Sequence, residues 1–192
     1  MFTRLDPLFA MLRWRYAFEY DKEGNLNGSQ PTDPPMQRLQ LIRNYRVLTN
    51  RDDIFAAMAA PTFDPRKDVI LESAPNPQPS SAGEKDEVKL LASSTDTLTI
   101  EANLPSPAIL LITDNYSQGW RARPLDGTAQ THYEVLPANY CLRAIPLAAG
   151  HHRLRVEYLP AGFVVGKWIS LAAVVIYLSL LGWQVKKRKL SR

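Results

Sequence analysis

Aromatic and cationic side chains gather in TDNYSQGWRARPLDG, residues 113–127, between two apolar runs. Aromatic rings offer large flat faces that can stack on sugar rings, and guanidinium groups can donate to phosphate or hydroxyl oxygens. The candidate glycan contacts are Tyr116, Trp120, Tyr140 and Arg143. Strand alternation, however, places Trp120 on the same face as Ala122, which favours a core anchor over a ligand platform.

Acidic residues in and after the same stretch could supply a pair of carboxylates for acid–base chemistry. These are Asp114, Asp126 and Glu134. Asp126 precedes Gly127 and is explained by a turn, while Asp114 lies where an apolar strand ends. We therefore predict no catalytic residue in this chain.

Cations near these acids, Arg121, Arg123 and Arg143, could contact phosphate on a lipid-linked donor or an anionic polymer, although solvated strand faces explain them more simply. The three histidines lack partners at metal-ligand spacing, and neighbouring strand residues point to opposite faces. Phosphate-loop and nucleophile-elbow motifs are missing from the sequence. No metal and no cofactor is predicted.

Alternating apolar residues predict that these side chains are carried by β-strands. Leu98, Ile100 and Ala102 alternate with polar residues, and AILLI, residues 108–112, is a continuous apolar run that predicts a strand buried on both faces. About seven short strands are expected between 88 and 159. The fold class is therefore mainly β, with an antiparallel, jelly-roll-like β-sandwich over 88–160.

Upstream of the sandwich, the pattern predicts a small α/β segment. A strand is expected over Leu39–Leu48, then a helix capped by Asn50 with Ile54, Phe55 and Met58 on its apolar side, and a second strand in DVILES. The expected organisation is a membrane-proximal segment and loop over 1–37, strand–helix–strand over 38–73, and a Pro/Ser-rich linker over 74–87. The stretch 113–127 is interpreted as a corner between strands.

A membrane anchor is predicted near the C-terminus. WISLAAVVIYLSLLGWQV, residues 168–185, has 18 residues without a charge, and as a helix it spans about 27 Å, close to the hydrocarbon thickness of a bilayer. A transmembrane helix is expected over 164–185, with a basic tail over 186–192. The anchoring residues expected at its ends are Trp168, Trp183, Lys186, Lys187, Arg188 and Lys189.

The distribution of charge predicts the orientation. The net charge is +4, but the last seven residues alone hold five cations, so the rest of the chain is nearly neutral and a nucleic-acid partner is not expected. The positive-inside rule places the tail in the cytoplasm and the body outside. Because the apolar run Leu8–Leu12 is too short for a signal peptide, the chain is expected to be the end of a longer polytopic protein. A tail-anchored protein with a cytoplasmic body remains the other option.

A longer pattern of residues spans the sandwich and its approach to the helix. It comprises Tyr116, Gly119, Trp120, Ala122, Asp126, Gly127, Asn139, Tyr140, Arg143, Ala144, Pro146, Ala149, Gly150, His152, Tyr158 and Pro160. This pattern, with the upstream NYRVLTNRDDIFAAMAAPTFDPRKDVILE, resembles the C-terminal region of YfhO-type bacterial membrane proteins. Gln118 stands where the family often has proline.

The resemblance implies a polytopic protein similar to membrane glycosyltransferases that use lipid-linked sugars to glycosylate cell-envelope polymers. The family's catalytic acids are expected in an N-terminal membrane half that nothing here matches. The chain is then expected to be a non-catalytic extracytoplasmic sandwich plus the last transmembrane helix, in the bacterial cytoplasmic membrane. Its expected partners are membrane lipid, a cell-envelope glycan or lipid-linked sugar, and that membrane half. The alternative is a free-standing membrane-anchored module that binds glycan or protein.

Overall fold

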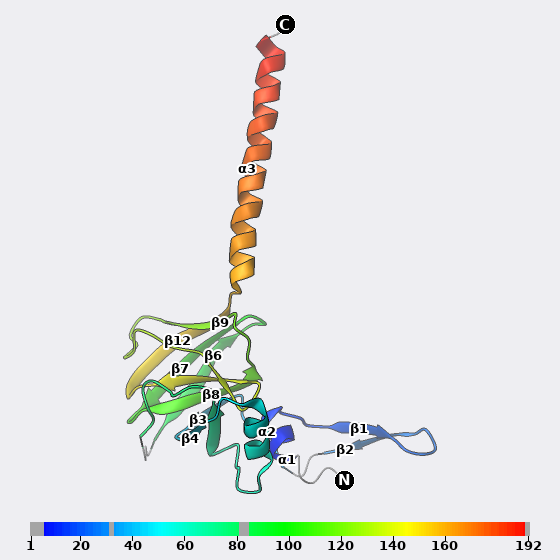
Figure 1. Cartoon of the computed structure of the whole chain (residues 1–192), viewed down its shortest axis with the longest axis vertical. Helices are drawn as coiled ribbons and strands as arrows, with labels where there is room; N and C mark the ends of the chain where they lie inside the picture. Colours follow the sequence, from blue (N-terminus) through cyan, green and yellow to red (C-terminus); the bar gives the residue numbers. More distant parts are fainter. Residues whose placement is uncertain (1–5, 31–32, 81–84, 191–192) are drawn as a thin grey trace. The chain divides into compact units, whose positions relative to one another are not determined.

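The computed structural model describes residues 6–30, 33–80 and 85–190, and it confirms a mainly β fold that ends in one long helix. The chain divides into two compact units, Met1–Glu157 and Tyr158–Arg192. The first unit contains two stacked β-sheets, a short two-stranded sheet and two short helices, and the second is dominated by the C-terminal helix (Figure 1).

The larger sheet has six strands in the order β3-β8-β11-β10-β5-β4. Its strands are β3 (Leu39–Ile42), β4 (Asn44–Val47), β5 (Asp68–Leu71), β8 (Ala108–Asn115), β10 (Leu136–Ala138) and β11 (Leu142–Leu147). Every pair in it is antiparallel except β4 with β5, which run parallel. The segment 38–73 thus supplies three strands of the same sheet that contains β8, β10 and β11.

The smaller sheet has four strands in the order β6-β7-β12-β9. They are β6 (Glu87–Ser93), β7 (Thr97–Leu104), β9 (Trp120–Pro124) and β12 (Gly150–Tyr158). With β8, β10 and β11 this gives the seven strands expected after residue 88, within the part of the chain that the structure describes. The chain passes repeatedly between the sheets, as a sandwich requires.

An inter-sheet core fills the space between the two sheets. It is built from alternate residues of both, because successive side chains on a strand point to opposite faces. Its buried members are Leu39, Leu98, Ile100, Ala102, Leu104, Ala108, Leu110, Ile112, Tyr133, Ile145, Leu147, Leu154 and Val156.

A helix-side core covers the opposite face of the six-stranded sheet, where α1 (Asp6–Met11) and α2 (Arg51–Ala59) lie (Figure 1). Its members include Met11, Ile54, Met58, Ile109 and Leu111. Strand β8 thus contributes alternate residues to both cores, and residues 108–112 are fully buried. The prediction of a strand buried on both faces is confirmed.

Helix α2 begins where the sequence predicts it. The side chain of Asn50 accepts a hydrogen bond from the backbone N–H of Asp52 at 2.8 Å, which satisfies one of the donors left free at a helix start. Ile54 and Met58 are buried as expected, whereas Phe55 is exposed and contacts the ring of Tyr140 instead of the core.

The predicted strand Leu39–Leu48 is two strands, β3 and β4, at opposite edges of the larger sheet. The break falls at Arg43, whose guanidinium forms an ion pair with Asp86 and donates to Ser106 Oγ. The alternation of apolar and polar residues does not reveal such a break, because one polar residue fits the pattern of a strand as well as that of a turn.

The stretch 113–127 is a corner, as the sequence analysis predicts. Strand β8 of the larger sheet ends at Asn115, and β9 of the smaller sheet begins at Trp120. A second crossing between sheets, from β11 to β12, uses Gly150 with φ of +118°, where an added Cβ would lie 2.8 Å from the Cβ of Ala129. Only glycine fits this conformation without strain.

A hairpin of β1 (Ala17–Tyr20) and β2 (Leu26–Ser29) extends from the first unit (Figure 1). The carboxylate of Asp21 accepts hydrogen bonds from the backbone N–H groups of Glu23 and Asn25, which close the loop between the two strands. Phe18, Tyr20 and Leu26 are exposed along this hairpin.

The C-terminal helix α3 (Ala161–Leu190) contains a stretch, Ala161–Trp183, that is long and apolar enough to cross a membrane. It has 23 residues with a mean hydropathy of 2.0 in its most apolar window, and none of that window is buried within the structure. The helix predicted at the C-terminus is therefore present, and its apolar stretch begins three residues before the expected range 164–185 and ends two residues before its end.

Candidate functional site

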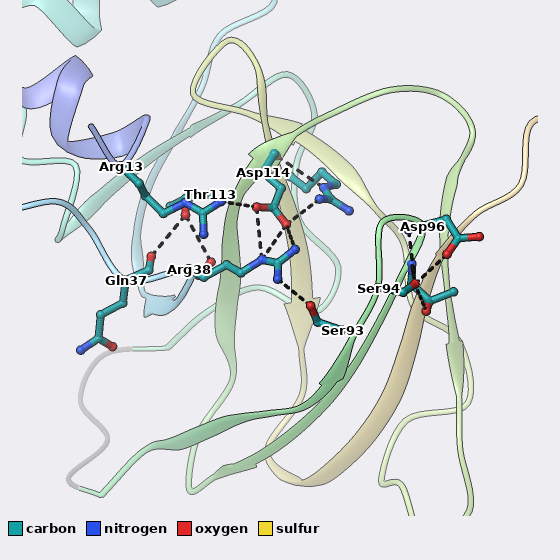
Figure 2. Close-up of polar contacts among 10 residues, drawn as sticks. Arg13, Gln37, Arg38, Ser93, Ser94, Asp96, Thr113 and Asp114 are labelled. Atoms are coloured by element: carbon teal, nitrogen blue, oxygen red, sulfur yellow. Dashed lines mark hydrogen bonds and ion pairs between the residues drawn. The ribbon is translucent and has the colours of Figure 1, made fainter. Parts of the chain in front are cut away.

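The carboxylate of Asp114, at the end of β8, is the centre of an arginine cluster (Figure 2). Arg13 Nη2 lies 2.7 Å from Oδ1, and Arg38 donates to Oδ2 through Nε at 2.9 Å and Nη2 at 2.7 Å. Arg143 Nη2 lies 2.9 Å from Oδ2. We call Arg13, Arg38, Arg143 and Asp114 the Asp114 cluster. It holds three cations and one anion.

The backbone around α1 positions Arg13. This residue has φ of +58°, a left-handed conformation that non-glycine side chains adopt at some energetic cost. Its N–H donates to Ala10 O, and the next N–H, of Trp14, donates back to Phe9 O, both at 3.1 Å. These bonds satisfy carbonyls at the end of the short helix, so the turn both closes α1 and directs Arg13 to Asp114.

Pairing beside β3 positions Arg38. The backbone N–H of Thr113 donates to Arg38 O at 3.0 Å, and the Thr113 hydroxyl donates to Gln37 O at 3.3 Å. Arg38 Nη1 also donates to the Ser93 hydroxyl at 3.1 Å, as Figure 2 shows. Arg38 is therefore held by both sheets, since Thr113 belongs to β8 and Ser93 to β6.

Arg143 is the buried member of the cluster. Its side chain is 2% exposed, and its guanidinium carbon lies 3.7 Å from the ring centroid of Trp120, a cation–π arrangement. Burial, opposed by the charge of Asp114 and reinforced by the charges of Arg38 and Arg13, lowers the pKa of Arg143 to about 10. It stays charged at neutral pH, and its Nη1 is buried without a hydrogen-bond partner among the described residues.

This burial corrects the interpretation of Arg143 as part of a solvated strand face. Arg121 and Arg123 are exposed, as that interpretation expects. They surround Glu157, which lies 2.8 Å from Arg121 Nη2 and 3.7 Å from Arg123 Nε. Arg155 Nε lies 3.8 Å from the same carboxylate. Exposed pairs of this kind contribute little to stability.

The structure does not gather the candidate glycan residues into one platform. Arg143 and Trp120 are in contact, and Trp120 packs against the inter-sheet core. Tyr140 instead meets Phe55 and Arg51 beside α2, over the helix-side core. Tyr116 is partly buried, and its backbone N–H donates to Cys141 O at 2.7 Å. Glycan contact by these residues stays a prediction.

The remaining acids and histidines have structural environments. Asp126 precedes Gly127, whose φ is +79°, in a turn, and Glu134 is exposed. The buried ring of His152 donates from Nε2 to Ala148 O at 2.8 Å, and its Nδ1 lies 2.8 Å from the hydroxyl of Tyr133. Within the described residues, no group of three acid, histidine or cysteine side chains could hold a metal ion.

A shallow depression of about 190 Å³ lies on the outer face of the smaller sheet. His151 and Glu101 line it, with a ring nitrogen 3.3 Å from the carboxylate, and Glu87, Lys89, Ala102 and Asn103 complete the lining. Hydrogen bonds to Gly127 O and to Glu101 raise the pKa of His151 above its usual value. Both side chains of this pair are exposed.

Sequence reasoning missed Arg13 and Arg38 and gave Asp114 only a strand-ending role. One signal was available: Arg143 lies in the otherwise apolar run CLRAIPL. A charge in such a strand is buried only if it is paired, so a carboxylate partner could have been inferred. The two other arginines lie 101 and 76 residues from Asp114 in sequence, and no local pattern connects them.

The expected anchoring residues lie on α3. Trp168 and Trp183 are 62% and 61% exposed, and Lys186 is also exposed. The backbones of Lys187, Arg188 and Lys189 continue the helix, and their side chains lie outside the described part of the structure.

Comparisons with protein-family models, with curated proteins and with solved structures found no match to this chain. The functional assignment therefore depends on the chemistry of the chain itself.

Proposed function

We propose that this chain is a non-catalytic extracytoplasmic β-sandwich carried by the last transmembrane helix of a polytopic bacterial membrane protein. The parent protein would resemble YfhO-type, glycosyltransferase-like proteins that act on cell-envelope polymers, and the sandwich would brace the membrane half or shape its acceptor side. The observation that carries the proposal is the exposed apolar stretch Ala161–Trp183 directly after β12.

The solvation of this stretch supports a membrane location. All its leucines and isoleucines and most of its valines are exposed, and soluble monomers rarely present so much contiguous apolar surface. A helix of 23 residues is about 34 Å long, enough for the hydrocarbon core. The basic residues after it favour a cytoplasmic tail, which places the sandwich outside.

The state of Asp114 supports a non-catalytic role. This carboxylate, the best placed of the three weighed for acid–base chemistry, is engaged by three guanidinium groups. Its oxygens lie within 2.9 Å of all three groups, so this carboxylate is suited to charge pairing rather than to acid–base chemistry.

Cysteine accessibility in intact cells tests both the anchor and its orientation. With Cys141 replaced by serine, Ser80→Cys in the exposed segment before β6 and Ser191→Cys in the tail are treated with a membrane-impermeant maleimide. We expect Ser80→Cys to react in intact cells and Ser191→Cys only after permeabilisation, with the C141S protein as the unlabelled control. The reverse pattern, or recovery of the protein in the soluble fraction, contradicts the proposal.

The second candidate function is a glycan-binding module, favoured by one observation. Phe55 and Tyr140 form an exposed aromatic pair with centroids 6.4 Å apart, and Arg51 lies over the Tyr140 ring. Cell-wall polysaccharide should then retain the wild-type protein and release the Tyr140→Ala variant, while Tyr20→Ala in the hairpin serves as an exposed-tyrosine control. Failure of the wild-type protein to bind polysaccharide rules this function out.

A further inference from the structure

We propose that the Asp114 cluster is a binding site for a phosphate monoester. Arg13, Arg38 and the Ser93 hydroxyl form its accessible rim, and Arg143 supplies positive charge from beneath. This inference goes beyond the proposed function and does not depend on the membrane anchor.

The charge of the cluster is the first argument. Three guanidinium groups meet one carboxylate within 2.9 Å, which gives the four residues of the cluster a formal charge of +2 in a partly buried position. Like charges at short range repel, and burial weakens solvent screening. A phosphate monoester carries about −1.5 to −2 charges at neutral pH, so its charge matches the excess of the cluster.

The buried guanidinium is the second and independent argument. Arg143 is 2% exposed, and its Nη1 has no hydrogen-bond partner among the described residues. Buried polar atoms without partners are rare and costly. Burial lowers the pKa of Arg143, and the charges of Arg38 and Arg13 lower it further although Asp114 opposes them, so a second anion beside the cluster would be favourable.

The rim is built to present donors. The side chains of Arg13 and Arg38 are 37% and 29% exposed, so each is open in part to solvent. Asp114 fixes the orientation of both guanidinium groups. The Ser93 hydroxyl accepts a hydrogen bond from Arg38 and can still donate its own hydrogen. Forked guanidinium groups of this kind favour phosphate oxygens over single-point anions.

Titration of the full chain in lipid nanodiscs with glycerol 3-phosphate tests the site. Ionic strength is held constant with sodium chloride, and binding is measured by calorimetry and by ³¹P NMR line broadening. The variants are Arg38→Gln, Arg13→Gln and Arg38→Lys. Arg66→Gln is the matched control, because Arg66 is 32% exposed and faces one carboxylate, that of Asp33.

We expect saturable binding to wild type and to R66Q with equal affinity. Loss of charge-assisted hydrogen bonds should weaken binding to R38Q and to R13Q by about tenfold to a hundredfold. R38K, which keeps the charge and loses the fork, should fall between. The proposal is overturned if wild type does not bind, or if all variants bind alike. Near-ultraviolet circular dichroism without ligand verifies that each variant is folded. If R38Q does not fold, comparison of R38K with the wild-type protein still tests the proposal.

The lipid composition of the nanodiscs separates the two sources of a phosphate monoester. Phosphatidic acid carries one as its headgroup, and phosphatidylcholine carries none. If the site takes the headgroup, nanodiscs with phosphatidic acid weaken apparent binding of glycerol 3-phosphate by competition, and R38Q abolishes that difference. If it takes a soluble ester, the affinity is the same in both lipids. Either result supports the site and identifies the source of the phosphate monoester that it binds.

Discussion

Arg143 shows how one residue can determine the arrangement of distant parts of the chain. Removing a guanidinium from water is costly unless it is paired and hydrogen-bonded. Its partner Asp114 is at the end of the neighbouring strand, and Asp114 in turn holds Arg13 and Arg38. A buried charge of this kind therefore connects α1, β3, β8 and β11 in one network.

Replacing Asp114 with asparagine should destabilise the protein strongly. Arg143 would remain buried without a counter-charge, a situation that typically costs about 3–5 kcal/mol. Urea unfolding of the full chain in detergent micelles, followed by tryptophan fluorescence, measures the change. Glu134→Gln, at an exposed carboxylate, should change the free energy of unfolding by less than about 0.5 kcal/mol. Equal effects of the two substitutions would show that Asp114 does not stabilise Arg143.

Two adjacent histidines should give stability opposite dependences on pH. Burial lowers the pKa of His152, so the unfolded chain binds its proton more readily and stability falls as pH drops below about 6.5. The pKa of His151 is raised, chiefly by its hydrogen bond to Gly127 O, so its contribution is present at low pH and is lost as pH rises.

Urea midpoints between pH 5.5 and 7.5 separate these contributions. We expect the His152→Asn variant to lose the destabilisation at acid pH, and the His151→Gln variant to show a steeper destabilisation than the wild-type protein. His132 is exposed, so His132→Gln serves as the control for the substitution of a histidine. A wild-type midpoint that rises as the pH falls would mean that His151 outweighs His152.

Strand β8 is the element that both cores share. Ile109 and Leu111 face the helices, while Ala108, Leu110 and Ile112 face the smaller sheet. Its continuous apolar sequence predicts this double burial because neither face has to meet water.

Leu111→Ala in β8 should cost about 2–5 kcal/mol, because the cavity cannot be filled by solvent or by easy repacking. Leu91→Ala in β6, where the side chain is 45% exposed, is the matched control and should cost less than about 1 kcal/mol. Urea unfolding of both variants measures the difference. Losses of similar size would contradict the assignment of β8 to the interior.

Other elements could be predicted from the sequence only in part. Asn50 and Pro61 define the ends of α2 by local chemistry, so that helix was predictable. The strand predicted in NYCLRAIPL begins at Leu142, because Asn139 and Tyr140 adopt positive φ angles in a turn. The Asn139 amide oxygen accepts from the N–H of Ile70 at 2.8 Å, a tertiary contact that alternation does not encode.

At the scale of the whole molecule, solvation divides the chain into a body with two closed cores and a helix whose apolar face is exposed along its length. Composition and the period of apolar residues were sufficient to predict a mainly β body and a C-terminal apolar helix, but not that residues 38–73 belong to the larger sheet. They could not predict the Asp114 cluster, because its members come together only when β3, β8, β11 and the end of α1 are in place.

Two charges in the middle of the apolar helix should release the protein from the membrane. The Val174→Arg, Leu178→Arg double variant places arginines where each costs about 2.5–3.5 kcal/mol. We expect a lower fraction of this variant in membranes washed with alkaline carbonate. Val174→Leu with Leu178→Val preserves hydropathy and should behave as wild type. Full retention of the arginine variant would indicate that another part of the chain holds it.

The parallel pairing of β4 with β5 and the insertion of β10 beside β5 bear on how the protein can be shortened. A cut in the Pro/Ser-rich connection would remove three strands from the larger sheet and uncover one side of β8. Residues 88–160 are therefore not a minimal folding unit, and a soluble truncation suited to crystallisation must retain the chain from α1 through β12.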